Sequence, residues 1–285
     1  MRIVSTLLAF ATFFLVSCQK ERDFTNTASG GTGNTGSDGL LVKTVVRDGS
    51  DSMVTTYGYD SNKRLSSLNK KGIDDQGNTV NAEYHFHRNA SGIITDYSAT
   101  DPTLIAAGID SIKTIVHYSS SRYTSYVLSI NVPGFVVLDS SVFVYDGTGR
   151  IVGENFYQSP SGIGNDYYLS GKINYSYLSS GNLSGFVIHD YDQSGTEVFT
   201  AYASNMTYDA KINPIHLGNE AFALGHPEWV SSNNILSEQN SDSGGPADDQ
   251  SVTYAYTYNA NNKPATGTIT IMPDNTVGNT TYYYQ

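Results

Sequence analysis

The chain has 285 residues, of which 15% are charged and 12% are aromatic, and its formal net charge is −11 at pH 7. A net negative charge argues against nucleic acid or an anionic lipid surface as the partner, because both would repel the protein. The single cysteine excludes a disulfide framework and a thiolate metal site. Tyrosine (22) and glycine (27) are abundant, and because tyrosine favours strands and glycine favours turns, the composition predicts β structure.

The N-terminus has one positive charge, at Arg2, followed by an apolar run from residue 3 to residue 16, which is typical of a secretory signal. At roughly 14 residues the run is too short for a membrane-spanning helix, which needs about 20. It ends in Leu15-Val16-Ser17-Cys18, which resembles the lipobox of bacterial lipoproteins. The resemblance implies that residues 1–17 are a signal peptide and that Cys18 carries a diacylglycerol and a fatty acyl chain such as palmitate. The alternative is a fortuitous cysteine in an ordinary signal peptide.

The charged cluster Gln19-Lys20-Glu21-Arg22-Asp23 resembles the export signal that sends Bacteroidetes-type lipoproteins to the outside of the outer membrane. It implies a lipid-anchored protein at the cell surface; the alternatives are the periplasmic leaflet and a plain solvated linker. Residues 25–39 are rich in Gly, Ser, Thr and Asn, so we expect residues 18–39 to be the lipidated cysteine and a flexible tether. Asp51-Ser52-Met53 and Asp110-Ser111-Ile112 resemble the O-glycosylation acceptors of those bacteria.

From residue 40 onward an alternating strand repeatedly ends in aromatic-x-aromatic and meets a polar turn, at intervals of about 30 residues. The copies are Tyr57-x-Tyr59, Tyr84-x-Phe86, Phe143-x-Tyr145, Tyr175-x-Tyr177, Met206-x-Tyr208 and Tyr256-x-Tyr258, with a weaker one at Val116-x-Tyr118. Residues two apart share a face of a strand, so the last copy places Val252, Tyr254, Tyr256 and Tyr258 on one face and Thr253, Ala255 and Thr257 on the other. This pattern is typical of an antiparallel sheet with one covered side, joined by hairpins.

The sequence therefore predicts one all-β domain over residues 40–285. We expect an antiparallel up-and-down meander of about a dozen or more strands, curled into a barrel or half-barrel, because sheets this wide rarely stay open. Two segments break the alternation. Residues 100–108, with Pro102 near the start and Gly108 at the end, predict a short helix. Residues 213–240 carry Pro214, Pro227 and Trp229 without alternation and predict a long excursion with one helical turn, followed by a mobile acidic loop at 241–250.

The repeated hairpin motifs resemble those of two known families. The unit Tyr145-Asp146-Gly147-Thr148-Gly149-Arg150-Ile151 resembles the Tyr-Asp repeat of Rhs-type wrapping shells. The lipobox, the repeated hairpins and the unit from Tyr208-Asp209 to Asn213-Pro214-Ile215, which leads into Ser232-Asn233-Asn234, resemble a family of secreted Bacteroidetes lipoproteins of unknown function with a porin-like fold. This second resemblance implies a meander curled into a barrel or half-barrel and implies no known catalytic residues.

One motif suggests catalysis. Asp242-Ser243-Gly244-Gly245-Pro246 matches the stretch around the nucleophile of chymotrypsin-like serine proteases. Those enzymes also need a histidine and an aspartate held against the serine, and they place the histidine in an Ala-Ala-His-Cys context that no histidine here has. Since Ser, Gly, Pro and Asp are also the residues of loops, an ordinary loop is the favoured interpretation. The enzyme alternative is a hydrolase within 213–250 that uses His216, His226 or Ser243.

Two patterns suggest metals. Glu83, His85 and His87 lie on one face of a strand and could share a metal ion, but we favour the alternative that they form the solvent-exposed face of an amphipathic strand. Asp190, Asp192 and Ser194-Gly195 resemble the start of a calcium loop, but Ala201 stands where the bidentate glutamate belongs, so we favour a hairpin turn. We expect no cofactor.

The tyrosine ladder, with Tyr254, Tyr256 and Tyr258, and the single Trp229 could stack against sugar rings, or the ladder could be the core face of the sheet. We therefore expect a lipid-anchored envelope or surface protein, attached to the membrane through its N-terminal lipid, that binds a glycan or an envelope protein without catalysis. The hydrolase is the alternative. An integral outer-membrane barrel is less favoured, because the strands lack an outward apolar band.

Overall fold

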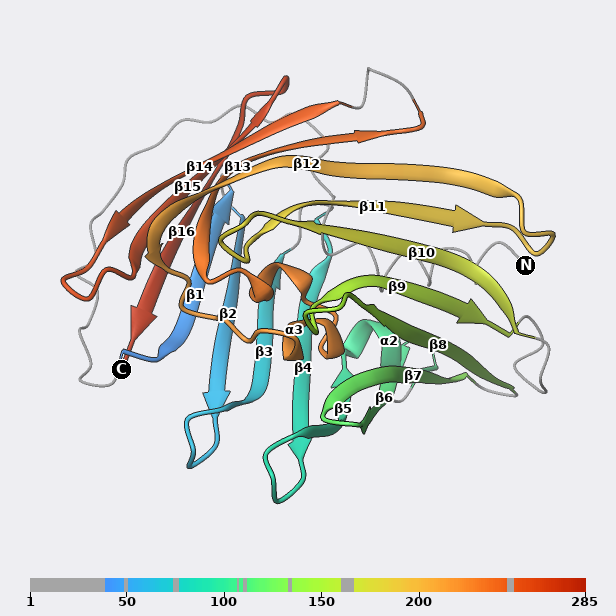
Figure 1. Ribbon diagram of the computed structural model, residues 1–285. Coiled ribbons are helices and arrows are strands. Elements are labelled where there is room, and N and C mark those ends of the chain that lie inside the picture. The colour runs from blue at the N-terminus through green and yellow to red at the C-terminus, as the bar shows by residue number, and fades with distance from the viewer. Residues whose placement is uncertain are drawn as a thin grey trace.

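The computed structural model describes residues 39–48, 51–73, 77–106, 108–109, 112–132, 135–159, 167–244 and 249–285. Sixteen antiparallel strands form a closed barrel in which each strand pairs with the next along the chain and β16 pairs with β1 (Figure 1). The predicted all-β meander is confirmed, and the sheet closes fully. The strands are β1 (Leu41–Asp48), β2 (Asp51–Tyr59), β3 (Leu65–Ile73), β4 (Thr79–Arg88), β5 (Ile94–Thr100), β6 (Ile112–Ser119), β7 (Arg122–Val132), β8 (Phe135–Tyr145), β9 (Ile151–Gln158), β10 (Tyr168–Tyr177), β11 (Leu183–Tyr191), β12 (Glu197–Ile212), β13 (Asn233–Asp242), β14 (Gln250–Tyr258), β15 (Pro264–Met272) and β16 (Thr276–Tyr284).

The two ends of the barrel differ. Successive strands run in opposite directions, so every second connection lies at the same end. One end, which we call the plugged mouth, carries the repeated polar turns and the 213–232 segment; its turns are 60–64, 89–93, 120–121, 146–150, 178–182 and 259–263. The other end, the opposite mouth, carries the turn at 192–196 and the predicted short helix, α2 (Pro102–Ala106), which is confirmed.

Four of the turns at the plugged mouth share one hydrogen-bonding scheme. In the turn after β8, Asp146 Oδ1 accepts hydrogen bonds from the backbone N–H of Thr148 at 2.8 Å and of Arg150 at 3.0 Å. The first residues of the turns after β2, β4 and β14, which are Asp60, Asn89 and Asn259, accept the same two bonds. Such side-chain-to-backbone bonds are the reason that Asp and Asn favour turns. The predicted hairpins after β2, β4, β8, β10 and β14, including the Tyr145-Asp146 unit, are confirmed. The prediction is wrong for the Met206-x-Tyr208 copy, because β12 continues through Asp209 to Ile212 and leads into the 213–232 segment.

The tyrosine face of the sheet points inward. On β14, Val252 is buried and the three tyrosines after it at alternate positions are half-buried, whereas Thr253, Ala255 and Thr257 are exposed. The predicted alternation is thus confirmed, with the ladder on the covered side. The interior contains an apolar cluster built by strands from β3 to β12, including Leu68, Phe86, Phe143, Ile173, Tyr175, Phe186 and Met206.

The predicted excursion is shorter than expected. The residues outside the sheet end at 232, because Asn233–Asp242 form β13, hydrogen-bonded between β12 and β14. The sequence shows no apolar alternation over this strand because two of its inward-facing residues, Glu238 and Asn240, are polar. The expected loop at 241–250 is likewise partly strand, and residues 245–248 lie outside the described residues. The excursion contains two short helical turns, α3 (Glu220–Ala223) and the 3-10 turn η1 (Pro227–Val230).

Several expectations fall on residues that are not described. These are the signal peptide at 1–17, Cys18, the tether up to residue 38, and the Asp110-Ser111 part of the second glycosylation motif. The first such motif, Asp51-Ser52-Met53, opens strand β2. Gly39 is the first described residue, and its carbonyl oxygen accepts a hydrogen bond from Lys263 Nζ beside the start of β15.

Candidate functional site

The 213–232 segment folds back into the plugged mouth of the barrel, and we call it the plug (Figure 1). Its Ala221-Phe222-Ala223-Leu224 stretch is buried, with Phe222 only 1% exposed. The Phe222 ring lies edge-on to Tyr175 of β10, with ring centroids 4.8 Å apart. Since these side chains belong to the central apolar cluster, the plug is part of the folded core.

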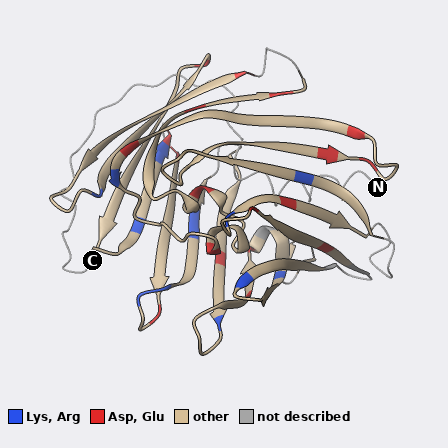
Figure 2. Cartoon of the chain, viewed as in Figure 1, with Lys and Arg blue, Asp and Glu red and all other residues tan. Residues whose placement is uncertain are grey.

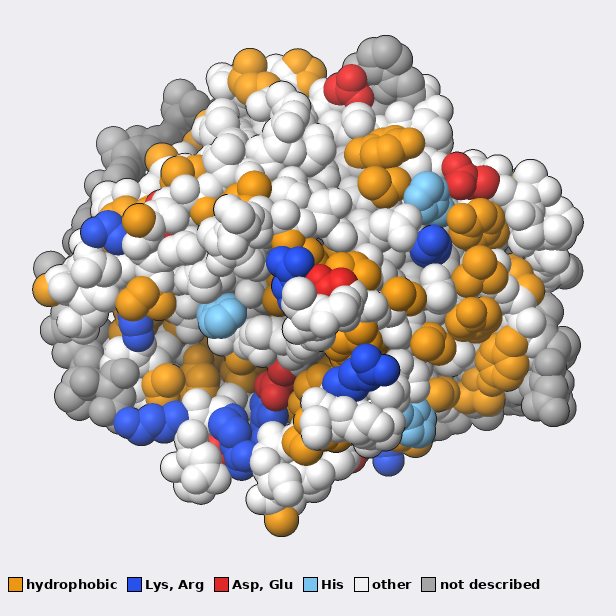
Figure 3. Space-filling view, in the orientation of Figure 1, with side chains coloured by type: hydrophobic (Ala, Val, Ile, Leu, Met, Phe, Trp, Pro, Cys, Tyr) orange, Lys and Arg blue, Asp and Glu red, His pale blue; other side chains and the backbone are white. Residues whose placement is uncertain are grey.

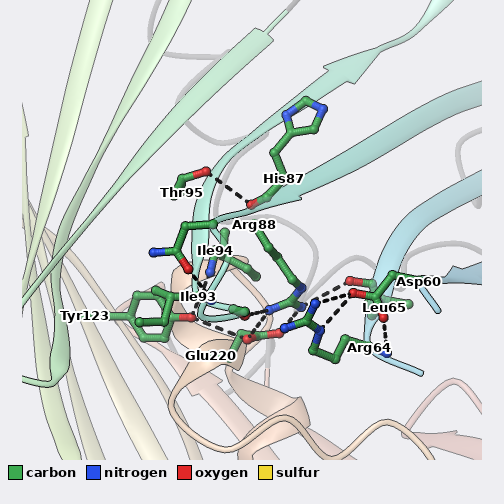
Figure 4. A network of polar contacts seen from close by, with 12 residues as sticks. Asp60, Arg64, Leu65, His87, Arg88, Ile93, Ile94, Thr95, Tyr123 and Glu220 are labelled. Carbon is green, nitrogen blue, oxygen red and sulfur yellow. Dashed lines mark hydrogen bonds and ion pairs between the residues drawn. The ribbon is translucent and has the colours of Figure 1, made fainter. Parts of the chain in front are cut away.

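An ion pair ties the plug to the barrel wall (Figure 4). Arg88, at the end of β4, donates two hydrogen bonds to the carboxylate of Glu220 in α3, at 2.5 and 2.7 Å. The guanidinium also donates to the carbonyl oxygens of Leu65 at 3.1 Å and Gly92 at 2.9 Å, and Tyr123 Oη donates to Glu220 at 3.4 Å. Burial lowers the pKa of Arg88, but the bonds to Glu220 outweigh this effect and raise the pKa.

A second set of bonds holds the other end of the plug against the turn before β11. Asn182, which is 2% exposed, accepts a hydrogen bond at its Oδ1 from the backbone N–H of Ser232 at 2.9 Å. The hydroxyl of Ser231 accepts a hydrogen bond from the N–H of Leu183 at 3.2 Å. The second bond is buried and the first is partly buried, and together they fix the return of the chain into β13.

The predicted aromatic ligand residues Tyr254 and Tyr258 face the interior and make structural hydrogen bonds. Tyr254 donates to Glu238 at 3.0 Å, and burial raises the pKa of this carboxyl group. Tyr258 donates to Asp209, which also accepts hydrogen bonds from the backbone and side-chain N–H groups of Asn234 at 3.1 and 3.0 Å. The ring of Tyr256 lies 6.1 Å from that of Tyr258. The ladder therefore lines the inside of the wall.

Trp229 lies in the plug, where the imidazole of His226 stacks on it at 3.8 Å between centroids and an angle of 10°. His226 Nδ1 lies 2.7 Å from a carboxylate oxygen of Glu228. One face of the indole is thus occupied by a residue of its own segment.

A buried carboxyl group that the sequence analysis did not single out lies deeper in the barrel. Glu154 of β9 is 4% exposed and accepts hydrogen bonds from Ser141 Oγ at 2.5 Å and Tyr175 Oη at 3.1 Å. Burial raises its pKa to about 7, against an ordinary 4.5. Nearby on β8, burial raises the pKa of Asp139 to about 6. The only signal in the sequence is an acidic residue within an aromatic-rich strand pattern.

The residues of the hydrolase alternative are not brought together. His216 and His226 lie in the plug, whereas Ser243 follows β13 at the opposite mouth, where its N–H donates to Thr200 of β12 at 2.8 Å. From Thr200 to the plugged end of β12 at Ile212 the strand advances roughly 40 Å at about 3.3 Å per residue. The serine and these histidines therefore share no site.

The two motifs that suggested metal sites occupy an exposed strand face and a hairpin turn. Glu83, His85 and His87 are exposed on the outer face of β4, where His87 Nδ1 lies 2.7 Å from Asp96 and His85 Nε2 lies 3.9 Å from Glu83. Over the part of the chain that the structure describes, no cluster of three His, Cys, Asp or Glu residues could hold a metal ion. The favoured hairpin at the calcium-like motif is confirmed, since Asp192 accepts hydrogen bonds from the N–H groups of Ser194 and Thr196, both at 2.9 Å.

The outer wall is largely polar. Charged residues are distributed over many strands (Figure 2), and the exposed outward residues of β14 are Ser251, Thr253, Ala255 and Thr257. In the view of Figure 3, apolar side chains gather over the strands around β8 to β10, where Val142 and Val144 are 41% and 40% exposed. Exposed apolar side chains also occur on β1, β3, β6, β12 and β15, at Val46, Ile73, Ile115, Tyr202 and Met272. No helix within the described ranges has the length and apolar character to cross a membrane.

Comparisons with known proteins identify the fold. No family model and no curated protein matches the chain. A porin-like protein from Bacteroides vulgatus ATCC 8482 matches with a TM-score of 0.54 and 11% identity, over 87% of this chain and 99% of that one. A porin-like protein from Bacteroides uniformis ATCC 8492 matches with a TM-score of 0.51 and 10% identity, over 86% and 98%. The porin-like barrel fold that the sequence resemblance implied is therefore confirmed.

Proposed function

We propose that this protein is a lipid-anchored β-barrel of the outer membrane, exposed at the cell surface, which binds a glycan and performs no catalysis. The lipobox ending at Cys18 and the charged cluster after it support the anchor and the location. The likeness to porin-like proteins of Bacteroides agrees with an envelope protein. The polar outer wall, with exposed His85, His87 and Thr253, favours a body that stands in water on its tether over one embedded in lipid.

The proposed binding role is supported mainly by the plug, which closes one mouth of the barrel. A barrel of 16 strands is wide enough for an aqueous channel. Here Phe222 fills the core at one mouth, and the Arg88–Glu220 ion pair holds the plug against the wall. This arrangement suits a rigid scaffold that presents loops, because binding residues are most often found on loops positioned by a rigid framework.

The proposal is tested with the full chain purified in mild detergent. On a glycan array we expect retention of polysaccharides, and in planar bilayers we expect no conductance steps. Large steady conductance of the kind that open porins give would contradict the plugged scaffold. Failure to bind any glycan on the array would contradict the glycan as ligand, and crosslinking to envelope proteins would then identify the other class of partner.

A further inference from the structure

A hollow of about 390 Å³ lies at the plugged mouth, between two hairpin turns and the plug. It is lined by Tyr118, Ser120, Ser121 and Arg122 of the β6–β7 hairpin and by Asn219 of the plug. Its volume lies at the lower end of the roughly 300–1,000 Å³ that small-molecule sites occupy.

The β6–β7 turn has an unusual backbone for its sequence. Ser120 and Ser121 have φ of 50° and 61°, and a two-residue hairpin turn with two positive φ angles favours Asn and Gly. Two serines in this conformation place hydroxyl groups at the hollow. A sparsely populated backbone conformation retained at one turn is a reason to suspect a role in binding.

Arg122 lacks the carboxylate partner that the other arginines of this mouth possess. Arg64 pairs with Asp60, Arg150 with Asp146 and Arg88 with Glu220, at 2.7, 3.0 and 2.5 Å. The guanidinium of Arg122 instead lies over the ring of Tyr145, 4.7 Å from its centroid, and among the residues that the structure describes no carboxylate lies within ion-pair distance of it. In a chain with a net charge of −11, such an arginine is available for an anion from outside.

The remaining lining groups fit a sugar. Tyr118 is 39% exposed, and Tyr123 supports it edge-on with ring centroids 5.1 Å apart. An aromatic face with a polar hydroxyl suits stacking against a sugar ring. Asn219 Nδ2 donates to the carbonyl oxygen of Gly149 at 3.0 Å, which fixes the side-chain amide while its oxygen can still accept a hydrogen bond from a ligand hydroxyl.

The barrel wall and the plug build this hollow together. Asn219 precedes Glu220, and Tyr123 both lines the hollow and donates to Glu220. The ion pair between Arg88 and Glu220 holds the plug in place, and this brings Asn219 into the lining of the hollow.

We infer that this hollow binds a saccharide that carries a carboxylate, such as a uronic acid residue. Arg122 pairs with the carboxylate, Tyr118 stacks on the ring, and the serine hydroxyls and Asn219 bind the ring hydroxyls. A planar guanidinium fork matches a carboxylate in geometry and in charge. The inference rests on the proposed glycan-binding function and specifies its ligand class.

The test compares a tri-galacturonate with the corresponding neutral galactose trisaccharide by titration calorimetry on the full chain. We expect the acidic sugar to bind more tightly and to weaken as salt is added. Arg122→Gln should weaken tri-galacturonate binding by about tenfold or more and leave neutral-sugar binding unchanged. The matched control is Arg150→Gln, since Arg150 also lies over a tyrosine ring at this mouth but is paired with Asp146, and it should leave binding unchanged.

Three outcomes would overturn the inference. Equal affinity of Arg122→Gln and the wild type for tri-galacturonate would do so while the glycan-binding function stands. Binding of neutral sugars alone would do the same. Binding of no sugar at all would overturn both proposals. Arg122 is exposed, so the variant should unfold at the wild-type temperature, and a thermal melt checks this before the titration.

Discussion

Arg88 and Glu220 are 132 residues apart in the sequence and form a two-pronged ion pair at 2.5 and 2.7 Å. Their side chains are only 7% and 19% exposed. Removal of one partner from such a pair leaves the other charge buried without compensation, which is more damaging than loss of the pair as a whole. If the plug left its position, Arg88 in the barrel wall would lose its partner, so the stability of the wall depends on the plug being in place.

Glu220→Gln should lower the free energy of unfolding by about 3 kcal/mol, the lower end of the range for buried pairs, because Glu220 keeps some contact with water. Urea unfolding measures this change. Cleavage of the 213–232 segment by a non-specific protease should become faster, since the plug loses its tie to β4. The double variant Arg88→Met/Glu220→Leu should recover part of the stability, because no buried charge is left unpaired.

Asp96→Asn provides the matched control on neighbouring strands. Asp96 pairs with His87 of β4 at 2.7 Å, but on the outer face, where the side chain of His87 is 60% exposed. Exposed pairs contribute little, so this variant should unfold near the wild-type midpoint. An effect as large as that of Glu220→Gln would mean that any charge change on these strands is destabilising, and it would remove the argument for the plug.

The buried carboxyl group of Glu154 should make stability depend on pH. Its pKa of about 7 in the folded protein lies above the ordinary 4.5, so between these values the folded state keeps a proton that the unfolded state has lost. The contribution of Glu154 to stability is then fully present below about pH 4.5 and is lost as pH rises toward 7, by an amount on the order of 3 kcal/mol. Asp139, whose pKa is raised to about 6, acts in the same direction.

Glu154→Gln isolates this contribution, because glutamine cannot titrate. Urea unfolding of both proteins at pH 5, 6, 7 and 8 should show the wild type losing more stability than the variant over the series. The residual slope of the variant reports Asp139 and two further carboxyl groups, Asp190 and Glu238, whose pKa values are raised by desolvation. Parallel pH profiles for the two proteins would show that Glu154 is ionised in the folded barrel.

The sequence predicts the wall well because the relevant signal is local. Alternation over a few residues places Tyr254 and Tyr256 on the inward face, and the Asp and Asn turns determine where each hairpin begins. Closure is different, since it depends on Lys43 of β1 pairing with Tyr283 of β16 across nearly the whole chain. A local pattern contains no information about that register.

The sequence predicts the plug only as a segment without strand alternation, and it does not predict that this segment packs inside the barrel. Its core residues Ala221, Phe222, Ala223 and Leu224 form an apolar run too short to show helical periodicity, and their partners lie on distant strands. The apolar run at residues 221–224 is the one feature of the sequence that could have indicated a segment buried in the barrel. The hollow beside Arg122 is harder to predict, because it depends on which arginines of the mouth find carboxylates in three dimensions.

Alanine substitutions at Gly185 and Gly147 test how closely β11 and β12 approach each other, with Gly147 as the control. A Cβ on Gly185 of β11 would meet the carbonyl oxygen of Ala203 and lie 3.1 Å from the Cα of Ser204, both on β12. Gly185→Ala should therefore destabilise the barrel by about 1–3 kcal/mol, because backbone must shift. At Gly147, in the turn after β8, nothing lies within 4 Å of the added atom, and Gly147→Ala should be neutral or slightly stabilising. Equal melting temperatures for the two variants would contradict this strand packing.

The proposed anchor makes a prediction about the mature N-terminus. Intact mass spectrometry of protein purified from membranes should give a chain that begins at Cys18 and carries diacylglycerol and an amide-linked acyl chain. Several chains hold a protein stably on a bilayer, whereas a single chain holds it weakly. Cys18→Ser should therefore move the protein into the soluble fraction with its melting temperature unchanged, because the polar outer wall needs no lipid. If Cys18→Ser stays in the membrane fraction after a carbonate wash, the barrel itself contacts the bilayer, and the tethered body proposed here is wrong.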